Sequence, residues 1–398
     1  MQNNFGFDNK KRKINIFYDG YYPMHETKDP GQIPIGLNEI GINTSLVTLK
    51  KAELSNYDSP FSLIQIKDLN EIANVIDSFD AVIFYSWLSV SFNEYLEDIK
   101  RLNKKIILKL DSDGRFGVTN EPKNRRSSYY IKNNPFSRST LGYIRRIIFP
   151  KVEQNNYIQR IKQIDISDAV VIESPDAANN LSFFLSKNGR SDLINKIHVI
   201  PDPVTPDIID SKIENKENII VSVGRWDDIA PKNPEGLIQT LNKFLSFKEN
   251  WQALVIGPGE NVIKQYIDKF NISNSVKQRI NVTGSLPHEK IKNYLLKSKI
   301  FFMPSRWESF GIAAAEGVCC GCTIVGSPIE SLRYLTLQGF SGNVSYSWDI
   351  DAMFGTLVYE SNRWENNEID YINIANYWRE KLNRQSIAKG FLKVIEKS

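Results

Sequence analysis

Short runs of apolar residues alternate with longer segments of helical periodicity along most of the chain. The runs are continuous and rich in Val, Ile and Phe, as in DAVIFY at 80–85 and QALVI at 252–256. Continuous apolar runs are typical of parallel strands buried on both faces. Their alternation with helices predicts open, doubly wound α/β sheets. We expect strands at 13–18, 44–49, 80–85, 105–110, 168–172, 196–200, 219–223, 252–256, 279–283, 299–303 and 322–325.

A proline-rich break divides these strands into two series. The segment PDPVTPDIID at 201–210 has three prolines within its first six residues, and the charged SKIENKEN follows it. Proline cannot donate to a ladder of hydrogen bonds, so the first series of strands ends here. The pattern predicts two α/β domains that face each other across a cleft, with their boundary near 203–217. The last segment, ending at Ser398, reads as helix.

Length and composition agree with this organisation. The chain has 398 residues, more than one hydrophobic core usually serves. Hydrophobic residues make up 41% and charged residues 24% of it, as in ordinary globular proteins. No apolar run approaches the roughly 18 residues that a membrane helix needs, and no apolar core follows the first charges as in a signal peptide. We therefore expect a cytoplasmic protein.

The three cysteines are neighbours in CCGC, at Cys319, Cys320 and Cys322. Such neighbours cannot form a disulfide framework. They also lack a second cluster at metal-ligand spacing. We expect small buried core residues rather than ligands.

Positive charge is concentrated in one segment. The chain has a net charge of +4, whereas 115–160 has ten Lys/Arg and two Asp/Glu, which gives 10 − 2 = +8. Aromatic residues are interspersed there. Such a segment indicates an anionic partner: a membrane surface, a lipid-phosphate acceptor or a nucleic acid. A solvated insertion without a partner explains it equally well.

Ligands of doubly wound sheets bind beyond the carboxyl ends of the strands, and the second half has suitable residues there. Gly224 follows one expected strand and permits a tight turn. Arg225 and Lys232 come next, before the helix that Pro234 opens. Two cations beside a helix start form a good anion site. Gly257 in GPGE permits close backbone approach, and Leu286 lies in a turn that a flat base could meet.

The segment RWESFGIAAAE at 306–316 carries two glutamates on either side of an expected helix start. We expect the helix to begin at Phe310, so the free amides of its first residues suit a phosphate. Each glutamate can accept hydrogen bonds from a vicinal diol. The pattern fits a nucleoside diphosphate sugar, although helix-start charge at Glu308 and an exposed position at Glu316 also explain it. The residues concerned are Glu308, Ser309, Phe310, Gly311, Ile312 and Glu316.

Residues 219–345, approximately, resemble the second domain of retaining GT-B glycosyltransferases of glycosyltransferase family 4. The resemblance rests on VSVGRWDDIAPKNPEGLI, VIGPGE and VTGSLPHEKIKNYLLKSKIFFMPSRWESFGIAAAEGVCCGCTIVGS. The family's E-x7-E element matches Glu308 to Glu316, and its basic pair matches Arg225 and Lys232. The first half of the chain matches only in outline.

The resemblance implies a GT-B fold with an acceptor-binding domain at 1–205, a nucleotide-sugar-binding domain at 206–378 and a final helix, 379–398, that crosses back to the first domain. It implies hexose transfer with retained anomeric configuration, without a metal or other cofactor. The donor is expected to be UDP-linked, with glucose as the sugar, although the sequence does not separate UDP from GDP. The acceptor is expected to be a saccharide or lipid-linked glycan of polysaccharide or glycolipid biosynthesis, with 115–160 at an anionic membrane and no nucleic acid as partner.

The resemblance also implies roles for individual residues. Arg225 and Lys232 would stabilise the departing diphosphate, and Glu308 would hold the transferred sugar. Glu316 would hold the ribose, while Leu286 would meet the base through its backbone. Ser309 and the amides at 310–312 would support the phosphates and sugar, with Gly224 and Gly257 in the adjoining turns.

The first half departs from the family pattern. Gly31, just before an expected helix, best matches the family's glycine-rich loop. Where the family often has a histidine near the sugar, Asp111 stands in LKLDSDG, and a shift of two residues would place Asp113 there instead. An aspartate can hold a sugar hydroxyl or receive the acceptor's proton, and His25 is a further candidate on the acceptor side. In the second half, Glu330 and Ser331 replace a common Gly-Gly pair.

Three other interpretations remain open at this stage. The Asp-x-Asp pair, Asp111 and Asp113, is the metal signature of the other large glycosyltransferase fold and would hold manganese. The chain could instead be a non-catalytic module that binds a nucleotide sugar or glycan. Nucleic-acid binding through 115–160 lacks any recognised module.

Overall fold

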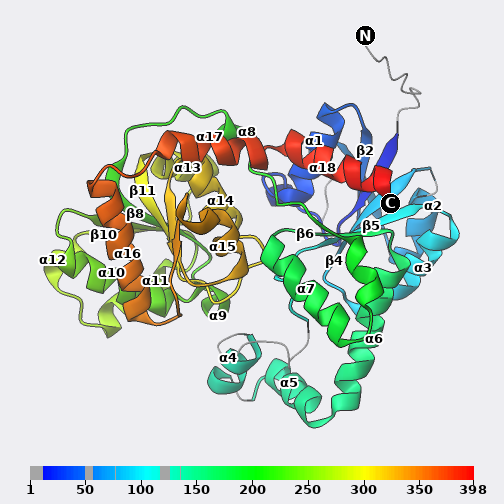
Figure 1. Cartoon of the computed structure of the whole chain (residues 1–398), viewed down its shortest axis with the longest axis horizontal. Coiled ribbons are helices and arrows are strands. Elements are labelled where there is room, and N and C mark those ends of the chain that lie inside the picture. Colours follow the sequence, from blue (N-terminus) through cyan, green and yellow to red (C-terminus); the bar gives the residue numbers. More distant parts are fainter. Residues whose placement is uncertain (1–11, 50–56, 77, 117–125, 135) are drawn as a thin grey trace.

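The computed structural model describes residues 12–49, 57–76, 78–116, 126–134 and 136–398. They form two lobes, each built on one parallel sheet with helices on its faces (Figure 1). The predicted fold class is confirmed. The expected basic residues at 117–125 lie outside the described part.

The first sheet has seven described strands in the order β3-β2-β1-β4-β5-β6-β7, all parallel. Six of them were predicted to within two residues. The exception is β3, in which SLIQI mixes polar and apolar residues at a half-buried edge of the sheet. The strands are β1 (Lys13–Phe17), β2 (Asn43–Leu49), β3 (Ser62–Ile66), β4 (Ala81–Ser86), β5 (Lys105–Leu110), β6 (Ala169–Ile172) and β7 (Ile197–Val199).

Helices cover both faces of this sheet, and the chain from β5 to β6 makes a long excursion through three of them. Several begin at capping residues: Ser174 accepts a hydrogen bond from the amide of Ala177, with Pro175 in the first turn. The helices are α1 (Asp29–Glu39), α2 (Ile72–Ile76), α3 (Asn93–Arg101), α4 (Arg126–Asn133), α5 (Arg138–Ile148), α6 (Pro150–Ile166) and α7 (Pro175–Lys187), with short 3-10 turns η1 (Pro23–His25), η2 (Leu69–Glu71), η3 (Val90–Phe92) and η5 (Ser191–Lys196).

The second sheet has six strands in the order β10-β9-β8-β11-β12-β13. Five were predicted. The short edge strand β13, of three residues, carries too little apolar sequence to be recognised. The strands are β8 (Glu217–Val223), β9 (Gln252–Ile256), β10 (Ile280–Gly284), β11 (Ser298–Met303), β12 (Thr323–Gly326) and β13 (Gly342–Val344).

The helices of the second lobe again lie on both faces of the sheet. The cysteines fulfil their prediction here, because all three are buried among the apolar residues between α14 and the sheet. The helices are α8 (Pro206–Ile209), α9 (Ile229–Lys232), α10 (Pro234–Phe247), α11 (Glu260–Lys269), α12 (Asn274–Lys277), α13 (His288–Lys297), α14 (Ile312–Cys319), α15 (Glu330–Thr336), α16 (Ile350–Glu365) and α17 (Tyr371–Leu382), with the 3-10 turn η6 (Leu337–Gly339).

Two crossings of the chain join the lobes. The first is the segment between β7 and β8. The second runs from α17 to α18 (Arg384–Lys397), which lies along α1 of the first lobe (Figure 1). The two crossings touch, since the Val204 amide donates to the Leu382 carbonyl over 2.8 Å. Ile387 and Phe391 of α18 are buried in the core of the first lobe.

A buried lysine fixes the first crossing. Lys109 on β5 has its ammonium 2.5 Å from Glu173 Oε1, just after β6, and 2.9 Å from Asp202 Oδ1, in the linker itself. All three side chains are almost fully buried. The contact with Asp202 is an ion pair without hydrogen-bond alignment, since Oδ1 accepts no hydrogen bond from any described residue. The ion pair between Lys109 and Asp202 therefore fixes the point at which the linker leaves the first sheet.

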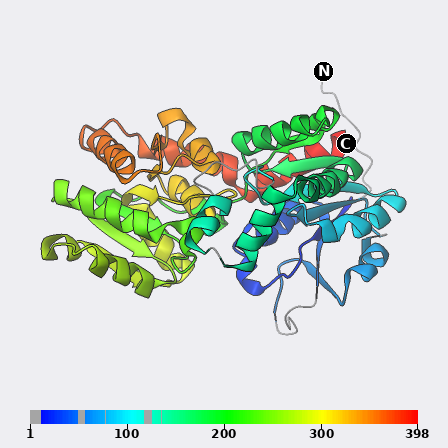
Figure 2. The same ribbon diagram turned by 90° about the horizontal axis from the view of Figure 1, so that it is seen from below.

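The lobes also meet directly on the side of the long excursion. Arg115 Nη2 lies 2.8 Å from Glu330 Oε1 at the start of α15, and the same oxygen accepts from Asn180 Nδ2 over 3.3 Å. Helix α4 contacts α9, and its Tyr129 ring lies 4.7 Å from the guanidinium of Arg306. Figure 2 shows this segment, in teal, between the two lobes. Arg115 is thus an interdomain residue and not part of a solvated surface.

Among the described residues, none of the helices combines the length and the apolar character needed to cross a membrane.

Candidate active site

The centre of the candidate site is an ion pair between two predicted residues. Lys232, the last residue of α9, places its Nζ 2.7 Å from Glu308 Oε1, and the Ser305 hydroxyl donates to the same oxygen over 2.7 Å. The two charged side chains are only 16% and 12% exposed. Lys232 takes this position because Asn233 turns the chain in a left-handed conformation, with φ of 55°, and caps α10. Both contacts use Oε1, so that among the described contacts Oε2 is the oxygen left as an acceptor for a ligand.

The helix after Glu308 begins two residues later than predicted. Helix α14 begins at Ile312, and Gly311 precedes it with φ of +83°, a conformation that favours glycine. Phe310 is buried instead of opening the helix. The free amides at this end are therefore those of the first turn from Ile312, and no side chain of residue 311 obstructs them.

A buried hydroxyl faces the same helix start. Ser331 is fully buried, and its Oγ has no hydrogen-bond partner among the described residues. This oxygen lies 3.9 Å from the position that a Cβ on residue 311 would occupy. A buried donor without a partner is costly, so this hydroxyl is available to an oxygen-bearing group beside Gly311.

Glu316 belongs to a chain of three polar side chains. Its Oε1 lies 2.9 Å from His288 Nε2, and His288 Nδ1 lies 3.2 Å from Asp207 Oδ2. The hydrogen bond to Glu316 raises the pKa of His288 above its usual value of 6.5, against the effect of burial. Glu316 is buried at 7% exposure, so it is not the exposed helix residue of the alternative interpretation.

Backbone hydrogen bonds join the carboxyl ends of β8, β9 and β10 and the turns that follow them. The Gly224 amide donates to Ile256 and the Gly257 amide donates to Gly284. Gly257 has φ of +123°, and a Cβ there would lie 1.9 Å from the Gly224 carbonyl oxygen, so both glycines serve close packing of the turns. Arg225 projects from this turn, 72% exposed, with Asp228 3.8 Å away. Leu286 packs against the core of the second lobe.

Across the cleft, Asp111 and Lys28 lie opposite the bases of the second lobe. Asp111 follows β5, and its Oδ2 accepts from Trp87 Nε1 over 3.4 Å. Lys28 precedes α1. Burial lowers the pKa of Lys28, and the nearby positive charges of Arg225 and Lys232 lower it further, while Asp111 opposes them. Arg225 and Lys232 of one lobe and Asp111 of the other are therefore all near enough to Lys28 to affect its pKa.

The remaining acceptor-side candidates have structural partners. Asp113 Oδ1 accepts from the Arg115 amide, so this carboxylate supports the turn after β5. His25 Nδ1 accepts from the Tyr22 amide, and burial lowers the pKa of His25. Gly31 lies within the first turn of α1 rather than before it. A Cβ there would lie 2.5 Å from Glu26 Cα, so the glycine allows α1 to approach the preceding turn.

The described residues contain no group of three or more His, Cys, Asp or Glu side chains that could hold the metal ion of the alternative interpretation. Asp111 and Asp113 would have to supply the protein ligands by themselves.

Four contributors were not predicted: Lys28, Ser305, Ser331 and the contact of His288 with Glu316. Ser305 and Ser331 follow the ends of β11 and β12, where the rule of strand ends could have found them. Lys28 and His288 reach the site through tertiary packing, which the sequence does not display.

Residues 205–380 match the family model described as glycosyl transferases group 1. The matched segment contains the whole second sheet and the helices around it. One curated relative is an uncharacterized glycosyltransferase, MJ1607 of Methanocaldococcus jannaschii. It is 22% identical over 192 residues, which are 43% of this chain and 48% of the relative. The chain matches about half or less of the length of the curated relatives.

Solved glycosyltransferase structures share the fold over nearly the whole chain. Sucrose-phosphate synthase from Thermosynechococcus elongatus superposes with a TM-score of 0.67 at 15% identity, covering 97% of this chain and 98% of that one. Anabaena HepE, determined in complex with UDP and glucose, gives a TM-score of 0.64 at 11% identity, covering 97% and 100%. Both lobes therefore have the GT-B arrangement, including the first, which the sequence matched only in outline.

The His288–Glu316 contact predicts a pH dependence of stability. Because the folded-state pKa of His288 is raised, the contact stabilises the fold fully below the unfolded pKa of about 6.5. This contribution is lost as the pH rises through the folded-state value. We expect the thermal midpoint of the wild type to fall over that interval more than the midpoint of His288→Gln does, measured by circular dichroism.

His198→Gln is the matched control. Burial lowers the pKa of His198, so its contribution to stability changes with pH in the opposite direction to that of His288. A His288→Gln profile that parallels the wild type above pH 6.5 would show that the contact carries no linked stability.

Proposed function

We propose that this protein is a retaining, metal-independent glycosyltransferase that moves a hexose, with glucose as our choice, from a UDP-linked donor. The acceptor is a saccharide or lipid-linked glycan in polysaccharide or glycolipid biosynthesis. The observation that carries the proposal is the Lys232–Glu308 pair beside the glycine-opened start of α14. The family of the second lobe supports glycosyl transfer.

The donor would lie along the second lobe. Glu316, held by His288, accepts the ribose hydroxyls, and the turn at Leu286 meets the base. The diphosphate lies at the start of α14, where the amides from Ile312, the Ser331 hydroxyl and Ser309 are nearest. Glu308 then accepts hydroxyls of the sugar through the oxygen that its protein partners leave open.

Transfer would be assisted mainly by charge. As the acceptor oxygen bonds to the anomeric carbon, the bond from that carbon to the diphosphate oxygen breaks and negative charge grows on the leaving group. Arg225 and Lys232 stabilise this charge, the exposed Arg225 being free to close over it. Lys28 adds a third cation from the first lobe. Asp111 either holds a hydroxyl or receives the proton that the acceptor loses, with Asp113 and His25 further along that wall.

We choose UDP and glucose because the structure of Anabaena HepE, which shares the fold, was determined in complex with UDP and glucose. In the alternative function, a non-catalytic module, the same groups would hold a nucleotide sugar without turnover. Lys28 and Asp111 favour the enzyme, because a donor-binding module has no need for charged groups on the opposite wall.

Glu308→Gln tests the site. The substitution keeps the size of the side chain and removes its charge, so donor hydroxyls and Lys232 both lose a strong acceptor. We expect kcat/KM for transfer or slow donor hydrolysis to fall by about 10- to 100-fold, measured by release of UDP from UDP-glucose.

Glu289→Gln on the exposed start of α13 is the control and should behave as wild type. The same assay with EDTA should show full activity. If Glu308→Gln turned over like the wild type, the assignment of Glu308 to the donor site would be wrong. If activity required added manganese, the metal-independent mechanism would be wrong, and a mechanism with manganese held by Asp111 and Asp113 would take its place.

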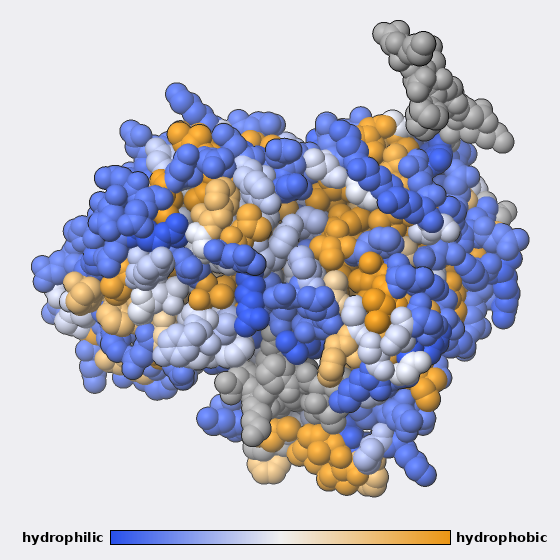
Figure 3. Space-filling model, in the orientation of Figure 1, coloured by the Kyte–Doolittle hydropathy of each residue, from blue (hydrophilic) through white to orange (hydrophobic). Residues whose placement is uncertain are grey.

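We further propose that the protein works at the inner face of a membrane as a peripheral, cytoplasmic protein. The support comes from α5 and the residues that flank it, where large apolar side chains are exposed beside Arg138, Arg145 and Lys151 (Figure 3, lower end). The exposed side chains are Phe136 at 92%, Leu141 at 56%, Ile147 at 50%, Ile148 at 61% and Phe149 at 57%. Apolar side chains bordered by bases suit an anionic lipid surface better than a base-reading nucleic-acid site.

Phe136→Ser/Phe149→Ser should weaken binding to vesicles that contain phosphatidylglycerol, because both rings would insert among the acyl chains. We expect the wild type to float with such vesicles at low salt and to be released at high salt. Phe247→Ser, at a 62% exposed ring of the second lobe, is the control. Failure of the wild type to float at low salt would contradict the membrane contact and leave the enzymatic proposal intact.

A further inference from the structure

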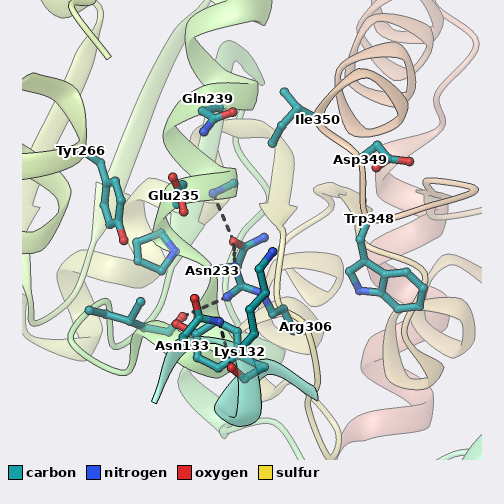
Figure 4. Close-up of a pocket in the computed structure, with 14 residues that line it drawn as sticks. Lys132, Asn133, Asn233, Glu235, Gln239, Tyr266, Arg306, Trp348, Asp349 and Ile350 are labelled. Atoms are coloured by element: carbon teal, nitrogen blue, oxygen red, sulfur yellow. Dashed lines mark hydrogen bonds between the residues drawn. The ribbon is translucent and has the colours of Figure 1, made fainter. Parts of the chain in front are cut away.

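A second pocket lies outside the Lys232–Glu308 site, between α4 of the first lobe and the second lobe. Its volume is about 490 Å³, within the range of roughly 300–1,000 Å³ typical of small-molecule sites. The starts of α10 and α16 and the loop at Arg306 form its second-lobe walls. Figure 4 shows Tyr266 and Trp348 on opposite sides, with Asn233 and Arg306 between them.

Aromatic faces and hydrogen-bonding groups alternate in the lining. Tyr129, Tyr266 and Trp348 supply rings, while Asn133 and Gln239 supply amides. The indole Nε1 of Trp348 is buried and has no hydrogen-bond partner among the described residues. This donor requires an acceptor, which a ligand oxygen in the pocket would provide.

The charges of the lining argue against an anionic ligand. Arg306 is committed to the protein, since Nη1 donates to the carbonyls of Ile229 and Ala230 and Nη2 donates to Asn233 Oδ1. The formal charges of Arg306 and Lys132 are matched in the lining by those of Glu235 and Asp349, and Glu235 also pairs with Lys269 over 3.0 Å. The lining therefore selects a neutral ligand with many hydroxyls and with C–H faces that stack on aromatic rings.

We propose that this pocket is a saccharide-binding site, distinct from the donor site, that holds a sugar unit of a glycan remote from the reacting end. None of the residues assigned to the donor lines it. Tyr129 reaches the pocket from α4 and covers Arg306 from the first lobe, so an occupant touches both lobes. This proposal rests on the proposed function in one respect only: the proposed function identifies the bound glycan as the acceptor. The binding of a saccharide to the pocket does not require that the protein transfer a sugar.

The test is titration calorimetry of the full chain with a panel of di- and trisaccharides of glucose, galactose and N-acetylglucosamine. We expect at least one to bind in the millimolar range. Tyr266→Ala should then weaken its binding about ten-fold through the lost stacking face. Trp348→Phe, which keeps a ring and removes the N–H, should weaken it about three- to ten-fold.

Tyr346→Ala is the matched control, because this ring is 86% exposed two residues before Trp348. It should bind as wild type, and circular dichroism should show that all variants melt together. Glu308→Gln should keep its saccharide affinity even though it loses transfer, and UDP should not displace the saccharide. The proposal is overturned if no panel member binds at millimolar concentration, or if Tyr266→Ala and Trp348→Phe bind the saccharide as tightly as wild type.

Discussion

The arrangement of the lobes depends on the buried ammonium of Lys109 and its ion pairs with Glu173 and Asp202. Burial acts to lower the pKa of Lys109, but Asp202 and Glu173 outweigh it and hold the pKa well above its usual range. Burial raises the pKa of both carboxyls, which Lys109 opposes. Breaking such a buried group by removing one partner costs about 3–5 kcal/mol. Because Asp202 belongs to the linker, the interaction that stabilises the first sheet also sets where the second lobe begins.

The position of the linker makes the two sets of strand ends face one another. Lys28 and Asp111 then lie opposite Arg225 and Lys232, and Arg115 meets Glu330 at one side. Arg225 and Lys232 repel the Lys28 ammonium, although the carboxylates of Asp228 and Glu308 lie beside these two bases, and burial of Lys28 adds to the cost. A diphosphate would relieve this repulsion. The charge arrangement thus supports the proposal that the donor is a nucleotide sugar.

How far the sequence predicted this structure depended on whether a feature was local. Buried strands such as β4 and β9 showed themselves as apolar runs, whereas edge strands β3 and β13, half polar or three residues long, did not. The start of α14 was misplaced because Gly311 adopts a left-handed conformation that interrupts a favourable helical sequence. In the candidate site, a motif predicted Lys232 and Glu308, which the structure brings together as an ion pair. Lys28, the His288–Glu316 contact and the Arg115–Glu330 ion pair acquired their meaning only from residues distant in the chain.

The most direct test of the account is calorimetric titration of UDP and UDP-glucose into the wild type and into Lys232→Met. The account predicts that both ligands bind the wild type, that UDP-glucose binding depends on Glu308 as well, and that Lys232→Met binds UDP about ten-fold or more weakly because a charge-assisted contact to the diphosphate is lost. Equal affinity of the wild type and Lys232→Met for UDP, or no binding of any nucleotide sugar by the wild type, would contradict it.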